Sequence, residues 1–163
     1  ANIDKISNPR LFFIPVCYDE KFGPDLQLIC ALKNFTFQQV ISLHSTPVYT
    51  VYFLGFLPGF LYLGGLDEKL FISRKIEPRM KVEKGAVGIG EKQTGIYPKN
   101  SPGGWQIIGR SPVEIFDKNK NPPCEIEPGD KVKFYPVTKN EFHLISERVA
   151  SGNFQLKKEN YGG

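Results

Sequence analysis

Cysteine, histidine and tryptophan are scarce in this sequence, which has 3 Cys, 2 His and 1 Trp among 163 residues. The cysteines, Cys17, Cys30 and Cys124, are widely spaced and form no C-x-x-C pair, which argues against a disulfide framework or a zinc site. Two histidines cannot build a histidine-rich metal centre, so we expect no bound metal. Thiols without such pairing suit a reducing cytoplasm, which is the expected location.

Long apolar runs are also missing. No stretch approaches the roughly 18 apolar residues that a membrane span needs, and residues 1–5 lack the basic start and apolar stretch of a secretory signal. Charge of one sign is not concentrated either, because 21 basic and 17 acidic residues are interspersed and leave a net charge of +4. We therefore expect neither a membrane nor a nucleic acid as a partner.

Glycine and proline, in contrast, are abundant, with 16 and 13 residues. This density of turn-forming residues argues against a helical bundle and favours short strands joined by turns. β-Branched and aromatic residues predict strands at 11–17, 48–54, 86–90, 94–97, 106–110, 113–116, 131–136 and 153–156. The sequence contains no internal repeat or long linker, so it predicts one mainly β domain over residues 1–163, closed as a barrel.

A few short helices are expected beside the strands. Pro24 suits the first position of a helix, and Asp25 suits the positive end of its dipole. Residues 36–39 and 138–141 each match the S/T-x-x-E/Q capping box and precede apolar residues at helical spacing. The sequence therefore predicts helices that begin near these three positions.

Two loops rich in glycine and proline, residues 55–65 and 93–105, are the strongest candidates for a site. Glycine lets a backbone approach a ligand closely, and successive N–H groups can hold an anion or a developing oxyanion. The alternative is that the glycines serve tight turns and the neighbouring rings fill the core. Motifs of P-loop, dinucleotide-binding, serine-hydrolase and zinc-protease sites are absent, and two dense loops in one small domain favour a binding site.

Among the polar residues, His44 is a candidate acid or base because the ordinary pKa of histidine is about 6.5. Its alternative is a partly buried histidine at a helix end. Arg79 and Arg110 could clamp a carboxylate or a phosphate, or else form structural ion pairs that brace a turn. Trp105 is the only tryptophan and fits the core better than a stacking platform.

Several long motifs occur in the order of a known family: FLGFLPGFLYLGGL (53–66), GAVGIG (85–90), QTGIYP (93–98) and SPGGWQIIGR (101–110). Through these motifs the sequence resembles the KipI family. Members of this family are B subunits of the bacterial 5-oxoprolinase, related to allophanate hydrolase subunit 1 and the carboxyltransferase part of urea carboxylase. The likeness runs from about Ile14 to about Phe142.

The resemblance implies a cyclophilin-like β-barrel and a family N-terminal domain that precedes these residues in other members. It also implies an ATP-dependent amide hydrolase, in which the B subunit works with the C and A subunits to convert 5-oxoproline to glutamate, and which is inactive without them. Two alternatives stay open. One is a regulator that binds a sporulation histidine kinase, and the other is a partner protein of an allophanate or urea-type amide hydrolase.

The same resemblance, together with the two loops, leads to a set of candidate site residues. The expected catalytic residues are His44, Arg110 and Gln93. The expected substrate-binding residues are Phe56, Pro58, Gly59, Phe60, Tyr62, Arg79, Thr94, Tyr97, Ser101, Gly103 and Gly104. Their shared task is to hold a small lactam and to stabilise charge on its oxygen through backbone N–H groups and an arginine.

Overall fold

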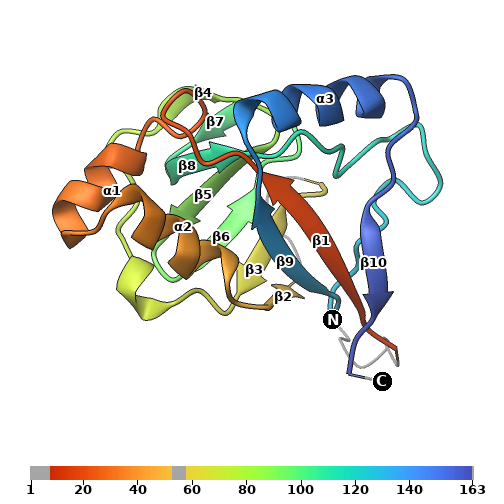
Figure 1. Ribbon diagram of the computed structural model, residues 1–163, viewed down its shortest axis with the longest axis horizontal. Coiled ribbons are helices and arrows are strands. Elements are labelled where there is room, and N and C mark those ends of the chain that lie inside the picture. The colour runs from red at the N-terminus through yellow and green to blue at the C-terminus, as the bar shows by residue number, and fades with distance from the viewer. Residues whose placement is uncertain (1–7, 53–57, 163) are drawn as a thin grey trace.

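A computed structural model describes residues 8–52 and 58–162 of the chain and shows a mainly β fold with three α-helices (Figure 1). The strands are β1 (Arg10–Val16), β2 (Tyr49–Tyr52), β3 (Leu61–Gly64), β4 (Arg79–Val82), β5 (Ala86–Gly90), β6 (Gln93–Ile96), β7 (Ser101–Gly103), β8 (Gln106–Arg110), β9 (Lys131–Pro136) and β10 (Lys157–Asn160). The helices are α1 (Leu26–Lys33), α2 (Phe37–Ser45), α3 (Lys139–Ala150) and the short 3₁₀ helix η2 (Glu68–Leu70).

The main sheet has the strand order β10-β1-β9-β2-β3-β6-β5-β8, and β4 pairs with β7 in a separate ribbon. In the main sheet β1 and β9 run parallel, whereas the other neighbours are antiparallel. Strand β9 alternates half-buried lysines with buried Val132 and Phe134, the period of a strand that packs one face on a core. In Figure 1, α1 and α2 lie at one end of this sheet, and α3 lies along another side.

The outer edge of β8 is covered by the chain that follows β1. The Cys17 N–H donates to the Arg110 carbonyl at 2.8 Å, and the Arg110 N–H donates back to the Cys17 carbonyl at 3.1 Å. Earlier in β8, the Ile107 carbonyl accepts from the Asp25 N–H at 2.9 Å. The strand order itself is open, so these contacts join its β8 end to the region of β1, and full closure as a barrel stays a prediction.

Both predicted capping boxes are present. The Thr36 and Thr138 hydroxyls accept hydrogen bonds from the Gln39 and Glu141 amides at the starts of α2 and α3. The first helix begins after Asp25, which is its N-cap residue but does not cap it with its side chain. That carboxylate is turned toward β8 and β4 instead, so the dipole interaction predicted for it is replaced by contacts described below.

Several expected elements differ from the structure. Residues 61–64 form β3, although they lie in a segment predicted to be a loop, because Leu61 and Leu63 alternate with half-buried neighbours and pair with β2 and β6. Strands β4 and β7 were not predicted. The strand expected at 113–116 is wrong, since these residues bury Val113 and Ile115 without joining a ladder. The last strand lies at Lys157–Asn160 rather than at 153–156.

Buried side chains form two clusters. The larger one fills the space between α1, α2 and the sheet and includes Phe12, Ile14, Leu26, Val40 and Leu63. The smaller one is dominated by aromatic rings from the two glycine-rich segments. Within the described ranges, no helix has both the length and the apolar character to cross a membrane.

Candidate functional site

The two glycine-rich segments predicted to form the site meet through packed aromatic rings. Phe60 lies 5.0 Å from Tyr62, 4.9 Å from Tyr97 and 5.4 Å from Trp105 between ring centroids. The contacts with Tyr97 and Trp105 are edge-to-face, a favourable geometry for aromatic pairs. Phe60, Tyr97 and Trp105 are buried, and Tyr62 is half-buried. This ring cluster is therefore a packing unit, which agrees with the alternative interpretation of the loop rings and with the core position expected for Trp105.

Glycines around the ring cluster make room for it. A Cβ atom at Gly90 would overlap the indole of Trp105, and one at Gly103 would overlap the Tyr97 ring. A Cβ at Gly95 would overlap the Leu61 carbonyl oxygen of the neighbouring strand. These glycines are thus explained by close packing of rings and strands, and their positions do not depend on an amide cradle for a ligand.

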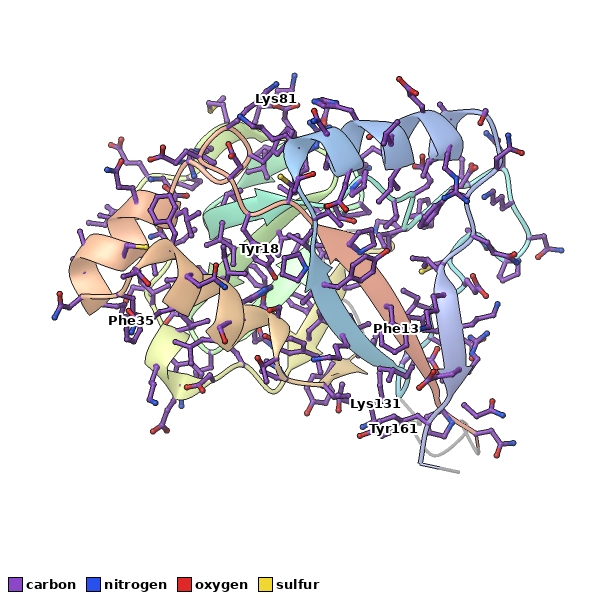
Figure 2. All side chains as sticks on the ribbon, viewed as in Figure 1. Phe13, Tyr18, Phe35, Lys81, Lys131 and Tyr161 are labelled. Carbon is purple, nitrogen blue, oxygen red and sulfur yellow. The ribbon has the colours of Figure 1, made fainter. Side chains whose placement is uncertain are left out.

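His44 is buried near the end of α2 inside a hydrogen-bonded network. Its partner Tyr18 lies in the middle of the molecule in Figure 2. The Nδ1 of His44 lies 2.6 Å from the Tyr18 hydroxyl, and its Nε2 lies 2.9 Å from the Thr94 hydroxyl. Thr94 donates its single hydroxyl proton to the Gly88 carbonyl at 2.8 Å, so it accepts from Nε2–H. Nδ1 is then the acceptor for the Tyr18 O–H, which assigns the neutral tautomer.

Burial lowers the pKa of His44 from 6.5 to about 3, because the charged imidazolium would lose its hydration. The ring is also stacked on Phe134, with centroids 4.8 Å apart. A fully enclosed imidazole that stays neutral at physiological pH is not placed to exchange protons with a ligand. The expectation that His44 acts as an acid or base near neutral pH therefore disagrees with the structure, which favours the buried structural histidine and encloses Thr94 with it.

Arg79 forms the structural ion pair that was its alternative interpretation. Its two terminal nitrogens donate to the Asp25 carboxylate at 2.6 and 2.8 Å, and the Ile107 N–H donates to the same carboxylate at 2.7 Å. Burial alone would raise the pKa of Asp25, but the bonds from Arg79 and Ile107, with Lys75 at 3.8 Å, outweigh it and lower that pKa. The forked edge of Arg79 is thus occupied by protein and does not clamp a ligand.

A cavity of about 160 Å³ lies beside this ion pair, between β4, β8 and the segment before α1. Its lining residues are Lys21, Phe22, Pro24, Arg79, Lys81, Val82, Glu83, Ala86, Ile107 and Arg110. We call this space the β4–β8 cavity. It contains two of the predicted site residues, Arg79 and Arg110, and four cationic side chains against one carboxylate, so its electrostatic potential favours an anion.

Arg110 is held in place on the rim of this cavity. Its Nε donates to the Lys84 carbonyl at 2.9 Å, and one terminal nitrogen lies 3.4 Å from the Glu83 carboxylate. The guanidinium also lies over the rings of Phe22 and Phe142, at 5.9 and 5.8 Å from their centroids. Of the three predicted catalytic residues, Arg110 alone lines the cavity, since neither His44 nor Gln93 is among its lining residues.

The remaining predicted residues are distributed around the molecule. Arg79 pairs with Gly103 across the β4–β7 ribbon, and Ser101 pairs with Val82, so part of the second loop lies next to the cavity-bearing strand. The Ser101 hydroxyl oxygen is buried and has no hydrogen-bond partner among the described residues. Gly104 follows this ribbon, and its carbonyl accepts a hydrogen bond from the Lys75 N–H at 2.7 Å.

On the first loop, Pro58 is exposed, and Gly59 adopts a φ of 81° close to Phe116. Gln93 faces Gly90 in the β5–β6 hairpin. Phe56 lies outside the described residues. Pro58, Gly59 and Gln93 are not among the residues that line the β4–β8 cavity.

Eight of the ten cavity residues were missed by sequence reasoning, among them Lys21, Phe22 and Lys81. The two lysines belong to no charge run, and the segments that carry them are 60 residues apart in sequence. The only available signal was the segment from Phe22 to Leu26, which precedes the first helix and binds β8 through Asp25. Among the described residues there is no group of three or more His, Cys, Asp or Glu side chains that could hold a metal ion.

With this geometry in place, comparison with known proteins defines the class. The model of the family described as carboxyltransferase domain, subdomain C and D, matches residues 1–126. The chain belongs to this family. This confirms the resemblance inferred from the glycine-rich motifs.

Curated relatives narrow the class further. The B subunit of 5-oxoprolinase from Bacillus subtilis is 42% identical over 140 residues, which are 86% of this chain and 58% of the relative. The corresponding 5-oxoprolinase protein of Escherichia coli is 48% identical over 127 residues, which are 78% of this chain and 58% of the relative. The chain therefore spans less than two thirds of the length of these proteins.

Solved structures agree with the fold. A protein of Pyrococcus horikoshii is 51% identical, with a TM-score of 0.78 over 81% of this chain and 61% of that one. The urea carboxylase of Kluyveromyces lactis shares the fold at 23% identity, with a TM-score of 0.76 over 94% of this chain and 16% of that one.

Proposed function

We propose that this chain serves in the B subunit of an ATP-dependent 5-oxoprolinase, which hydrolyses 5-oxo-L-proline to L-glutamate together with the C and A subunits in the cytoplasm. The observation that carries the proposal is its similarity to three curated 5-oxoprolinase B subunits, at 42–50% identity over 74–86% of the chain. The cyclophilin-like closure of the sheet is part of the same proposal and is supported by the bridge between Cys17 and Arg110.

The chemistry that such an enzyme performs starts from a stable lactam. Transfer of the γ-phosphoryl group of ATP to the lactam oxygen releases ADP and makes the ring carbon open to attack by water. Addition of water, opening of the C–N bond and departure of phosphate then yield glutamate. Each step involves an anionic substrate or a developing negative charge, which positioned cationic groups stabilise. Arg110 and the lysines of the β4–β8 cavity are the groups of this chain suited to that task.

The test uses the complete B subunit co-expressed with its partner subunits. We expect ATP-dependent release of glutamate from 5-oxoproline by the assembled complex, and no release by this chain alone. Arg110→Gln should lower kcat/KM by about tenfold or more, since a charged hydrogen-bonding group would be lost. Allophanate is included as a second substrate. Turnover of allophanate without turnover of 5-oxoproline, or no glutamate from the complex at saturating ATP, would contradict the proposal.

A further inference from the structure

We propose that the β4–β8 cavity binds the carboxylate of a small cyclic carboxylic acid. The inference rests on the proposed function, which identifies this acid as 5-oxo-L-proline. It goes beyond that function because it assigns a particular site and chemical group to the substrate, including Lys21, Phe22 and Lys81, none of which is among the predicted site residues.

Charge is the first argument. Glu83 is the one acidic side chain on the lining, against Lys21, Lys81 and two arginines. The Arg79 charge is largely balanced by Asp25, and Glu83 lies beside Arg110. Lys21 and Lys81 are exposed, and neither has a salt bridge among the described residues. The excess positive charge therefore belongs to these two lysines, of which Lys21 places its Nζ 5.6 Å from the ring centroid of Phe22, another lining residue.

Rigidity is the second argument. Arg79 is fixed by two hydrogen bonds to Asp25, and Arg110 is fixed by the Lys84 carbonyl and the rings of Phe22 and Phe142. An anion that binds in the cavity does not have to order these two arginines, which reduces the entropy lost on binding. Lys21 and Lys81 are the exposed cations of the lining, and Lys81 lies at the outer edge of the molecule in Figure 2, on the strand that borders the cavity.

Size and polarity select the ligand. The cavity has a volume of about 160 Å³, and half of its lining residues are apolar, namely Phe22, Pro24, Val82, Ala86 and Ile107. A bare phosphate would leave these apolar side chains without a contact, and a nucleoside triphosphate is larger than the cavity. A compact ring that carries one carboxylate fits both the apolar and the charged part of the lining. Its ring contacts the apolar side chains, and its carboxylate faces the lysines.

The experiment titrates the 163-residue chain with three probes. Binding is measured by the changes in backbone amide chemical shifts and by calorimetry. The probes are 5-oxo-L-proline, 2-pyrrolidinone, which has the same lactam ring without the carboxylate, and inorganic phosphate. We expect saturable binding of 5-oxo-L-proline with shifts at residues 21–22, 79–82 and 110, and at least tenfold weaker binding of the other two. Lys81→Gln should weaken binding three- to tenfold and Arg110→Gln more, whereas the control Lys118→Gln, an exposed lysine outside the cavity, should bind as the parent does.

The outcomes separate this inference from the proposed function. Equal binding of 2-pyrrolidinone, tighter binding of phosphate, no saturable binding, or an unchanged affinity in Lys81→Gln each overturns the carboxylate site. In the assembled enzyme, Lys81→Gln should raise the KM for 5-oxoproline and leave kcat nearly unchanged, because the lysine holds a group that does not react. Glutamate release with an unchanged KM would retain the proposed function and reject the site. Specific binding without any glutamate release would retain the site and reject the function.

Discussion

The imidazole of His44 is neutral in the folded protein because it has no exposed surface and its pKa is lowered to about 3. In the unfolded chain the same group titrates near pH 6.5, so between these values the unfolded state binds one more proton. The free energy of unfolding should therefore fall as the pH is lowered from 7 to 4.5, with a contribution of up to about 1.4 kcal/mol per pH unit from this residue.

Urea denaturation across this pH range measures the effect. His44→Gln should be less stable at pH 7, because Tyr18 and Thr94 lose well-placed partners, and its stability should depend less steeply on pH. His143→Gln, at the exposed histidine of α3, is the matched histidine substitution with which the slope of His44→Gln is compared. Parallel pH profiles for the parent and His44→Gln would show that His44 is not the buried neutral group described here.

Single residues also show which features of the site can be predicted from the sequence and which cannot. Arg79 and Arg110 were recognisable as anion-binding candidates from their residue type, and both line one cavity. Their roles differ because of a third residue, Asp25, which is 54 positions from Arg79 and occupies its forked edge. The burial of His44 depends in the same way on Tyr18, Thr94 and Phe134 from distant segments. Such contacts are set by tertiary packing, which local pattern does not contain.

At the scale of elements, the β3–β6 pair tests whether glycine is required for packing. A methyl group at Gly95 would overlap the Leu61 carbonyl oxygen and lie against Phe60 and Trp105. We expect Gly95→Ala to destabilise the protein by about 1–3 kcal/mol, since strands β3 and β6 would have to separate. Thermal unfolding and Trp105 fluorescence measure this change.

Gly104→Ala is the matched control, because the nearest atom to a Cβ there is 3.8 Å away. Its stability should stay within about 0.5 kcal/mol of the parent. Equal stability of the Gly95→Ala and parent proteins would mean that the two strands are less closely packed than described.

The elements found from sequence have strong local signals. Strands β1, β5, β6, β8 and β9 carry β-branched or aromatic residues, and α2 and α3 carry capping boxes. Two of the strands that were missed or misplaced, β10 and β7, lack such signals. Strand β10 reads Lys-Lys-Glu-Asn and is exposed throughout, so its pairing with β1 has no hydrophobic pattern, and β7 is three residues long with a central proline. Residues 113–116 show the reverse case. Their composition is typical of a strand, but they bury Val113 and Ile115 without pairing in a sheet.

At the scale of the whole molecule, sheet closure makes a measurable prediction. If the segment after β1 seals the edge of β8, the amide hydrogens of Cys17 and Arg110 are internal strand hydrogens. We expect them to exchange with deuterium at least about a hundredfold more slowly than the amide of exposed Lys118, measured by NMR at neutral pH. Exchange of the Cys17 amide at the rate of Lys118 would contradict closure at this edge.

The pairing of β1 also bears on how the chain acquires its structure during synthesis. Among the described strands, β1 is translated first, whereas its partners β9 and β10 are translated after all the others. Until β9 and β10 have been translated, Phe12, Ile14 and their neighbours lack the two strands that flank β1. The apolar β1 segment of the nascent chain is then exposed and can aggregate with other chains. A fragment trimmed to residues 1–126, the part that the family model matches, would lack β9 and β10, so β1 would stay without both of its partner strands.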